Sequence, residues 1–491
     1  MKRLAGTNSP AHQAAKHFMR GVNLGNYLEA PKGIGWGVTV SPQEFWFMKD
    51  QGFDHVRIPV KWSDYVDRTG GYEPGIRPAP ADNQPSTSSN QPPANEDEAT
   101  SPEPEVQIPF SAGRGVGGVL LQPARKKGSL KSKVQPPLQQ PGNSGRNLQQ
   151  TAALRPGSVA TAQVSLGTAQ GPVATAHPAY VQIASAEDSP RQVNLTAEQN
   201  TSTNAHFEVQ PGIFARADFA VTNALNAGLA VILNIHHFDD FTSDPLGQTN
   251  KFFAIWEQVA AHYAGYPPTL AFELLNEPKD AATTKVINPI FAQAIAIIRR
   301  TNPTRTIFVG PGMWNQASEL KNLVLPANDN NLIVTVHCYQ PFYFTHQGAT
   351  WAGPDVKPLK NIQFPGPPAE PLVLDPKVKL HPWVTNWIYR YNTLPPDRNP
   401  SSPLAFEKEL KLARQWGDYY GRPVHVGEFG CFTTADPESR ARFYAAFRQE
   451  CDRDKLGWAI WDWSAGFRYW DKKKNQPMPG MTEALFGKDE D

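Results

Sequence analysis

Short apolar runs, each ending in polar residues, recur along the chain and alternate with stretches in which apolar residues return every three or four positions. Runs of this length, apolar on both faces, are typical of strands buried in a parallel sheet. The predicted strands are Met19–Leu24, His55–Val60, Leu229–His237, Leu270–Glu277, Thr306–Gly310, Leu332–Tyr339, Pro423–Glu428 and Leu456–Trp463.

The intervening stretches have the period of amphipathic helices. The first opens with Ser41-Pro42-Gln43-Glu44, which predicts a capped start because Ser suits the N-cap, Pro the first turn and Glu the third helical position. The predicted helices are Ser41–Gln51, Ile213–Ala227, Lys251–Tyr263, Lys285–Arg300, Leu404–Trp416 and Pro437–Cys451.

Strands that alternate with helices in this way predict a closed (β/α)8 barrel, the TIM-barrel class. We expect residues 1–72 and 206–491 to form it, because they amount to roughly 350 residues, within the size range of that fold. A Pro-rich stretch from about Gly353 to Pro403 also contains Trp383 and Trp387. We expect it to form a packed loop after the sixth strand.

The composition changes between residues 73 and 205. This stretch is rich in Pro, Gln, Ser, Thr and Ala, and its aromatic residues are Phe110 and Tyr180. It has too little apolar surface to offset the conformational entropy lost on folding, so it is predicted to be a disordered insert after the second strand. A solvated linker is the simplest interpretation, and a weak contact of Arg125, Lys126 and Lys127 with a polyanion or partner is the alternative.

Charge and cysteine content exclude several classes of function. The formal net charge of +1 gives no reason to expect nucleic acid or a membrane as partner, and we expect a monomer. The three cysteines lack the spacing of a disulfide framework or a zinc site. The first residues contain no apolar segment typical of a signal peptide, which favours a cytoplasmic protein or a true start further upstream.

Polar groups cluster at the predicted strand ends, where barrels of this kind carry their catalytic residues. They comprise carboxylates, imidazoles, amides, a guanidinium, a phenol and an indole, and any one of them alone could be explained by packing. The residues are Asn26, Arg57, His236, His237, Asn276, Glu277, His337, Tyr339, Glu428 and Trp461.

Glu277 and Glu428 are the central pair. Glycoside hydrolysis needs one carboxyl group to protonate the leaving oxygen and another to meet the oxocarbenium-like centre. The fourth and seventh strands could bring two carboxyl groups to the separation of about 5–5.5 Å that retaining enzymes use. A structural role at a helix start would explain Glu277 alone, but it explains the pair less well.

The neighbouring groups could divide the roles of the two glutamates. Arg57 could lower the pKa of Glu428 by charge pairing, or it could form a purely structural salt bridge, for example with Glu273. Tyr339 could donate a hydrogen bond to Glu428, and His337 could orient Glu277. Asn276 could bind the sugar 2-hydroxyl.

Adjacent histidines raise the question of a metal. Residues next to each other on a strand point to opposite faces, so His236 and His237 are not expected to share one ion, and we predict neither a metal nor a cofactor. One histidine should face the substrate and the other should pack. Of Trp458, Trp461 and Trp463, one ring, expected at Trp461, should form a stacking platform, and the others should lie in the core.

These residues together resemble glycoside hydrolase family 5, the cellulase family. The resemblance is carried by an ordered set of motifs and is strongest to bacterial endoglucanases and mannanases. The motifs are Arg20-Gly-Val-Asn-Leu-Gly-Asn26, His55-Val-Arg-Ile-Pro59, Val231-Ile-Leu-Asn-Ile-His236-His237, Leu275-Asn276-Glu277-Pro278 and His425-Val-Gly-Glu428-Phe-Gly430.

The resemblance implies that Glu277 is the acid/base and Glu428 the nucleophile. Other active-site positions of the family match Arg57, His236, Asn276, His337, Tyr339 and Trp461. Substrate-binding positions match Asn26, Glu29, His237, His346, Trp351 and Phe467. It further implies that no cofactor is needed and that the protein is secreted or periplasmic, which conflicts with the missing signal segment.

The leading hypothesis is therefore a retaining, endo-acting hydrolase of β-1,4-glucan whose partner is a β-linked polysaccharide or oligosaccharide. A β-mannanase or glucomannanase acting through the same site is the alternative within the enzyme class. A carbohydrate-binding barrel without catalysis, or a scaffold for a functional insert, would belong to a different class.

Overall fold

A computed structural model of the chain describes residues 3–4, 6, 8–69 and 206–487. The predicted disordered insert, residues 73–205, lies outside the described residues and stays a prediction. Where the described chain stops and resumes, β3 (Val66–Thr69) and β4 (His206–Val209) form an antiparallel pair in which Thr69 lies opposite His206. The intervening stretch therefore leaves and rejoins the fold at one place, after the second barrel strand.

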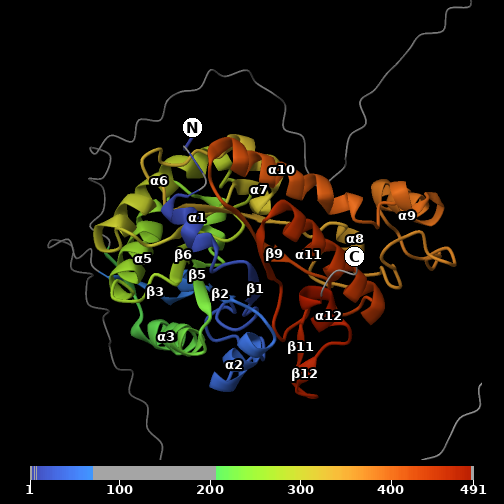
Figure 1. The fold of residues 1–491 in the computed structure, drawn as a ribbon, viewed down its shortest axis with the longest axis horizontal. Coiled ribbons are helices and arrows are strands. Elements are labelled where there is room, and N and C mark those ends of the chain that lie inside the picture. Colours follow the sequence, from blue (N-terminus) through green and yellow to red (C-terminus); the bar gives the residue numbers. More distant parts are fainter. Residues whose placement is uncertain (1–2, 5, 7, 70–205, 488–491) are drawn as a thin grey trace, which may run out of the picture. The chain divides into compact units, whose positions relative to one another are not determined.

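Eight parallel strands close into a barrel in the order β1-β10-β9-β8-β7-β6-β5-β2, as predicted (Figure 1). Each strand coincides with one of the apolar runs of the sequence. The strands are β1 (Arg20–Asn23), β2 (His55–Val60), β5 (Ala230–Ile235), β6 (Leu270–Glu273), β7 (Ile307–Val309), β8 (Leu332–His337), β9 (Val424–Phe429) and β10 (Gly457–Ile460).

Amphipathic helices pack their apolar faces on the outside of this barrel, and the six predicted ones are all present. At the first, the Glu44 carboxylate accepts a hydrogen bond from the Ser41 backbone N–H at 2.8 Å, as the capping motif predicts. The helices are α2 (Pro42–Asp50), α3 (Pro211–Asn226), α5 (Thr249–His262), α6 (Thr284–Thr301), α10 (Leu404–Tyr420) and α11 (Pro437–Asp454).

Shorter elements that the sequence pattern does not predict complete the described fold. They lie at the barrel ends and in the loops. They are α1 (Pro10–Ala15), η1 (Trp62–Tyr65), α4 (Asp239–Ser243), α7 (Gly312–Asn315), η3 (Ala317–Asn322), α8 (Phe342–Thr345), η4 (Pro396–Arg398), β11 (Trp470–Asp471), β12 (Gln476–Pro477) and α12 (Met481–Phe486).

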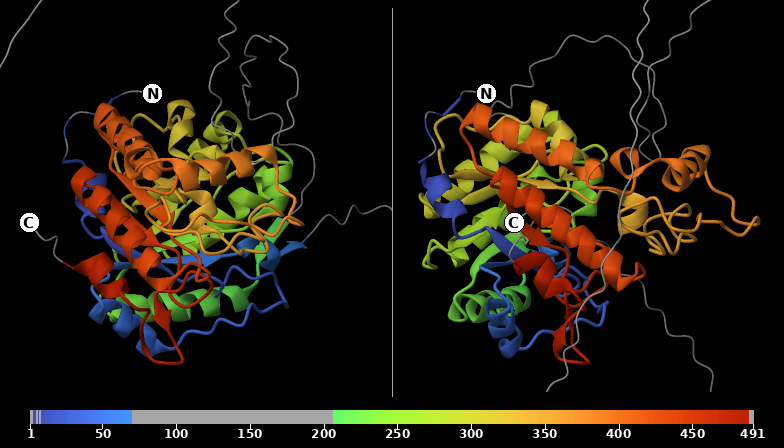
Figure 2. Two further views of the ribbon diagram at one scale, coloured as in Figure 1. Left: turned by 90° about the vertical axis from the view of Figure 1, so that its right-hand side faces the viewer. Right: turned by 45° about the vertical axis from the view of Figure 1, so that its right-hand side comes forward.

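The long loop after β8 is packed, as expected, and contains a helix of its own. In α9 (Pro382–Thr393), Val384 and Tyr391 are buried, and Trp387 stacks on Tyr391 at 5.4 Å. The right view of Figure 2 shows this orange segment extending beyond the ring of helices around the barrel. None of the helices in the described ranges has the length and apolar character needed to cross a membrane.

The barrel interior is built in layers of alternate side chains. A lower layer of Ile232, Ala271, Phe308 and Ile333 forms an apolar cluster that is closed from below by residues of α1. Above it the inward positions become polar, and Asn23, Arg57, Asn234, Glu273 and Thr335 are all buried. The carboxyl ends of the strands rest on this polar layer.

Gly21 on β1 gives the lower layer the room it needs. A Cβ atom there would lie 2.1 Å from Nε2 of His55, whose ring fills the same level. His55 is held in place by Asp54, 2.6 Å from its Nδ1, and by Nε2 of His425 at 3.2 Å. The imidazole cannot retreat without breaking these contacts.

Gly21→Ala should therefore lower the free energy of unfolding by about 1–3 kcal/mol, the usual effect of overpacking a core. Chemical denaturation followed by circular dichroism measures the loss. Gly35→Ala is the matched control, because a Cβ at Gly35 meets no atom within 4 Å. Equal stability of the two variants would contradict this account of the barrel interior.

Candidate active site

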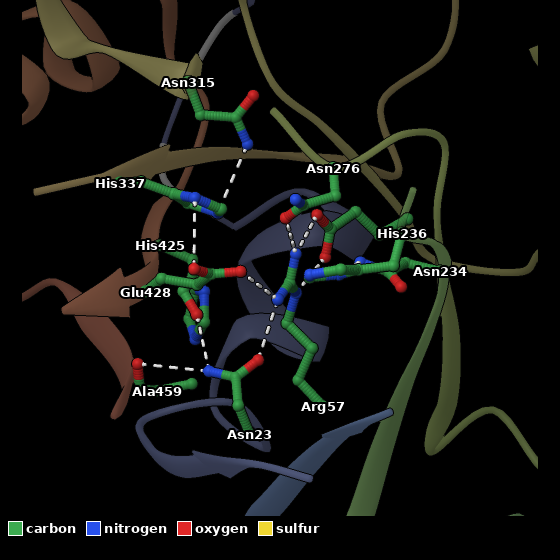
Figure 3. A network of polar contacts seen from close by, with 12 residues as sticks. Asn23, Arg57, Asn234, His236, Asn276, Asn315, His337, His425, Glu428 and Ala459 are labelled. Atoms are coloured by element: carbon green, nitrogen blue, oxygen red, sulfur yellow. Dashed lines mark hydrogen bonds and ion pairs between the residues drawn. The ribbon is translucent and has the colours of Figure 1, made fainter. Parts of the chain in front are cut away.

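Several of the predicted strand-end residues lie close together at the barrel mouth, and Arg57 on β2 lies among them. Figure 3 shows Arg57, His236, Asn276, His337 and Glu428. The Arg57 guanidinium is fully buried and donates to both carboxylate oxygens of Glu273, at 2.6 and 2.8 Å. It also donates to Asn23 Oδ1, Glu428 Oε1 and Asn276 Oδ1, each at 2.7 Å. Arg57 thus makes both the structural pair with Glu273 and the contact with Glu428 that were alternative interpretations of the sequence.

Glu428 near the end of β9 is held from two sides. Arg57 donates to its Oε1, and the Tyr339 hydroxyl donates to its Oε2 at 2.8 Å. Burial raises the pKa of Glu428, and the charge of Arg57 and the hydrogen bond from Tyr339 oppose this. The predicted contact of Arg57 is confirmed and its charge lowers the pKa of Glu428 as expected, but the loss of solvation outweighs this pairing, so the net shift is upward.

Glu277 lies in a different environment. His337 Nδ1 lies 2.8 Å from its Oε1, as the orienting role of that histidine predicts, and its side chain is 26% exposed. Burial raises the pKa of Glu277 to about 7, opposed by the charges of Arg57 and Lys279. No cation of the described residues contacts Glu277 directly, whereas Arg57 touches Glu428.

The two carboxylates lie close together. One oxygen of Glu277, one of Glu428 and a ring nitrogen of His337 all lie within 4.8 Å of one another. This is near the separation of about 5–5.5 Å of carboxyl groups in retaining glycosidases and shorter than the ~6.5–9.5 Å of inverting ones. The arrangement leaves room for a sugar carbon between the carboxylates and little for an additional water.

The backbone around Glu277 departs from the predicted strand. β6 ends at Glu273, and Glu277 has a left-handed φ of 44°. Met313, Trp314 and Asn315 of α7 are also left-handed, with φ of 55–56°, at a cost of roughly 1–2 kcal/mol for each residue. The Trp314 N–H donates to the carbonyl of Pro278 at 3.1 Å, which ties this strained turn to the residue after Glu277.

Three buried residues of the site, Asn23, Asn315 and Asp462, were not identified from the sequence, and Glu273 was considered there only as a structural partner of Arg57. Asn23 and Glu273 bind Arg57, and Asn315 Nδ2 lies 3.3 Å from His337 Nε2. Asp462 accepts hydrogen bonds from the N–H groups of Ala465 and Phe467, and burial raises its pKa to about 6. Asn23, Glu273 and Asp462 directly follow or end apolar runs and could have been found there, whereas no local signal marks Asn315.

Histidines and aromatic rings line one flank of the carboxylate pair. Trp461 is partly exposed and stacks on His236 at 5.4 Å, whereas Trp458 and Trp463 are buried, as predicted. His236 contacts His237 at 4.6 Å, and Trp36 lies edge-on to His237 at 6.3 Å. Trp36 is 43% exposed, and beside it Asn26 and other residues of its loop line a cavity of about 250 Å³.

The expectation that His236 and His237 could not share a ligand is wrong. β5 ends at Ile235, so the strand alternation stops before them. Donor atoms of Glu29, His236 and His237 lie within 4.8 Å of one another, so the three side chains could coordinate one divalent ion. Burial lowers the pKa of His237 to about 4 and holds that of His236 well below its usual range, so both imidazoles are neutral. The absence of a metal remains a prediction.

Glu29 is the buried member of this group. It is 1% exposed, its Oε1 accepts from the Asn26 N–H at 2.8 Å, and its Oε2 lies 3.5 Å from His236 Nε2. Burial raises the pKa of Glu29 well above the ordinary range, opposed by the Asn26 hydrogen bond. The left-handed φ of 64° at Asn26 turns the chain so that this contact forms.

A second row of rings starts at Tyr339. His346 contacts Tyr339 at 5.0 Å and Phe467 at 5.3 Å, and Trp351 lies 6.4 Å from Phe467. His346 and Phe467 are 8% and 4% exposed, whereas Trp351 is 62% exposed. The buried rings support the row, and Trp351 offers an open face.

All three cysteines, Cys338, Cys431 and Cys451, are buried and free. Cys338 lies between His337 and Tyr339 but is itself only 3% exposed, and burial raises its pKa well above the usual value. It is therefore a neutral thiol in the packing outside the site.

Comparison with known proteins agrees with this geometry. The model of the cellulase family, glycosyl hydrolase family 5, matches residues 191–466. Endoglucanase H of Acetivibrio thermocellus is 27% identical over 266 residues, which are 54% of this chain and 24% of that protein. Endoglucanase 3 of Fibrobacter succinogenes is 29% identical over 294 residues, 58% of this chain and 44% of that protein. The chain thus covers a quarter to less than half of the length of these relatives.

Solved structures share the fold. Endoglucanase Cel5A of Thermotoga maritima superposes with a TM-score of 0.60 and 23% sequence identity, covering 98% of this chain and 100% of that chain.

The raised pKa of Glu277 should make stability depend on pH. The folded value of about 7 lies above the ordinary 4.5, so over this window the native protein holds a proton that the unfolded chain has released. The stabilisation is complete below about pH 4.5 and is lost as pH rises through about 7. Glu277→Gln cannot ionise at this position. Between pH 5 and pH 8 its free energy of unfolding should therefore rise by about 1–3 kcal/mol relative to that of the unchanged protein.

Urea denaturation at the two pH values measures this difference. Glu370→Gln, which replaces an exposed carboxylate, should follow the unchanged protein at both. A parallel change of stability with pH in the Glu277→Gln variant would contradict the assignment.

Proposed function

Because this chain belongs to glycosyl hydrolase family 5, we propose that it is a retaining glycosidase that cuts β-1,4-glucan within the polymer by double displacement. Glu277 is the acid/base and Glu428 the nucleophile. The observation that carries the proposal is the pair of close carboxylates in unequal environments, one paired with Arg57 and Tyr339 and the other with a neutral imidazole.

In the first step Glu428 attacks the anomeric carbon while Glu277 gives its proton to the glycosidic oxygen. The C–O bond to the leaving sugar breaks, and an ester bond to Glu428 forms. Glu277 is suited to the acid role because burial raises its pKa to about 7. Glu428 is suited to attack because Arg57 compensates its negative charge.

In the second step Glu277, now ionised, takes a proton from water as the water oxygen attacks the anomeric carbon. The ester bond breaks, and Glu428 leaves as a carboxylate. Tyr339 donates to Glu428 Oε2 at 2.8 Å and Arg57 to Oε1 at 2.7 Å, so the departing carboxylate is solvated by two fixed donors.

Asn276 is placed to bind the sugar next to the bond that is cut. Its Oδ1 accepts from Arg57, which fixes the orientation of the amide and leaves Nδ2 to donate to a substrate hydroxyl. In this geometry Asn276 would contact the 2-hydroxyl, where a contact strengthens in the transition state. Arg57 thus orders both the nucleophile and the residue that binds beside it.

The two aromatic rows would bind the polymer on either side of the carboxylates. Trp461 and Trp36 belong to the row around His236 and His237, and Trp351 belongs to the row that starts at Tyr339. Flat indole faces suit the faces of sugar rings. Binding sites on both sides of the cleavage point favour cutting within a chain over removal of end units. The relatives named endoglucanase favour glucan as the polymer.

Glu277→Gln and Glu428→Gln should each lower kcat on carboxymethyl-cellulose by at least about 10²–10⁴-fold, the range for loss of a positioned acid/base. Glu370→Gln serves as the control with unchanged activity. A parallel panel of mixed-linkage glucan, xyloglucan and glucomannan identifies the polymer, and a preference for glucomannan would replace glucan by mannan as substrate. No release of reducing ends from any of them would overturn the enzyme assignment.

Retention is tested separately by the anomeric configuration of the first product. Proton NMR during hydrolysis of a soluble β-glucan oligosaccharide should show the β anomer before mutarotation, because two displacements restore the original configuration. An α product would exclude Glu428 as a covalent nucleophile, even if both glutamates proved essential.

A further inference from the structure

The Asn315 side chain lies inside the barrel mouth next to His337 (Figure 3). It is fully buried, and its Nδ2 lies 3.3 Å from His337 Nε2. On the other side of the ring, His337 Nδ1 lies 2.8 Å from Oε1 of Glu277. One imidazole therefore connects Asn315 to the proposed acid/base, and in the described part of the chain no other side chain hydrogen-bonds to Nε2.

The turn after β7 is shaped around this amide. A Cβ atom at Gly310 would lie 2.6–2.7 Å from the Asn315 amide atoms, so only glycine leaves the amide its space. The left-handed φ of 56° at Asn315 directs its side chain inward, a conformation that asparagine tolerates better than most residues. The same turn donates from Trp314 N–H to Pro278, the residue after Glu277.

A neutral imidazole has one N–H donor and one acceptor nitrogen. His337 is neutral at pH 7, because burial lowers its pKa to about 4. If the Asn315 amide donates to Nε2, the ring proton must be on Nδ1, where it points at Glu277. We propose that Asn315 is a positioning residue that holds His337 in this Nδ1–H tautomer, so that the ring always offers Glu277 a donor.

This arrangement, which rests on the proposed function, helps Glu277 in both of its states. When Glu277 is ionised, it accepts the Nδ1 proton and is stabilised as a base. When Glu277 is protonated, it cannot donate to a nitrogen that already carries hydrogen, so its own proton remains available to the glycosidic oxygen. The opposite tautomer would accept that proton and draw it away from the substrate.

Other charged groups face Glu277 and His337 from neighbouring elements and stay in place when Asn315 is changed. They are Arg57 on β2, Glu273 on β6, Lys279 after Glu277, and Glu428 and Tyr339 at the ends of β9 and β8. His236 and His425 also lie near His337 and are held neutral by burial. A change at Asn315 therefore alters the tautomer of His337 against a constant electrostatic background.

The tautomer can be read directly from the full-length protein labelled with ¹⁵N-histidine, with His337→Gln used to assign the signal. Long-range ¹H–¹⁵N spectra should show His337 as the Nδ1–H form. In Asn315→Gly, which fits the left-handed backbone and removes the donor, the Nε2–H form should become populated. Asn361→Gly, at an exposed left-handed asparagine outside the site, should leave the spectrum unchanged.

Loss of the Asn315 donor should shift the pH dependence of kcat/KM in one direction. In Asn315→Gly the protonated Glu277 can donate to Nδ1, so its pKa rises and the basic limb of kcat/KM should move up by about 0.5–1 pH unit, the effect of one hydrogen bond. A merely structural role would lower the rate without moving this limb. An unmoved or lowered limb in a folded variant would overturn the proposal.

The NMR result tests the role of Asn315 independently of the proposed function. An Nε2–H tautomer in the unchanged protein would overturn the role of Asn315 even if the Asn315→Gly variant did not fold. A protein that cleaves none of the polysaccharides yet shows the Nδ1–H form would overturn the glycosidase assignment and leave the Asn315–His337 contact established.

Discussion

The buried guanidinium of Arg57 is the interaction on which the barrel mouth depends. It uses its donors on Asn23, Glu273, Asn276 and Glu428, which belong to three other strands or their ends. Burying two carboxylates costs several kcal/mol each unless a cation and hydrogen bonds compensate them. Arg57 supplies both. Burial by itself lowers the pKa of Arg57, but the charges and hydrogen bonds of Glu273 and Glu428 outweigh this and raise it, so the guanidinium stays charged.

The distribution of charge around Arg57 also explains why the carboxylates behave differently. Glu273 and Glu428 contact the guanidinium directly, whereas in the described part of the chain the buried Glu29 and Asp462 and the partly exposed Glu277 have no cation at hydrogen-bond distance. Burial raises the pKa of these three groups and also that of Glu428, where the charge of Arg57 opposes the rise. A single buried cation placed off-centre thus distinguishes Glu428, whose negative charge it compensates, from the carboxyl groups that it does not touch.

Strain is concentrated where this chemistry would take place. Glu277 and the three residues of the turn after β7 have left-handed backbones, and Gly310 and the hydrogen bond to Pro278 keep that turn in position. Residues in such conformations persist when the surrounding structure over-determines them. Here the rigid barrel provides that support, since each strand end is fixed by its neighbours on both sides.

The sequence by itself determined the strands, the six main helices and the barrel. The order of apolar and polar residues directly shows which runs are buried on both faces and which have helical periodicity. It also pointed to Glu277, Glu428, Arg57, His337 and Tyr339, because parallel strands bring their carboxyl ends to one rim. Only the tertiary structure decided where the strands stop, that His236 and His237 lie close together beyond β5, and that Asn315 faces His337. The reason is that these features depend on loop dihedral angles and on contacts between distant segments. The net pKa of Glu428 likewise depends on how deeply the finished fold buries it, which no local pattern records.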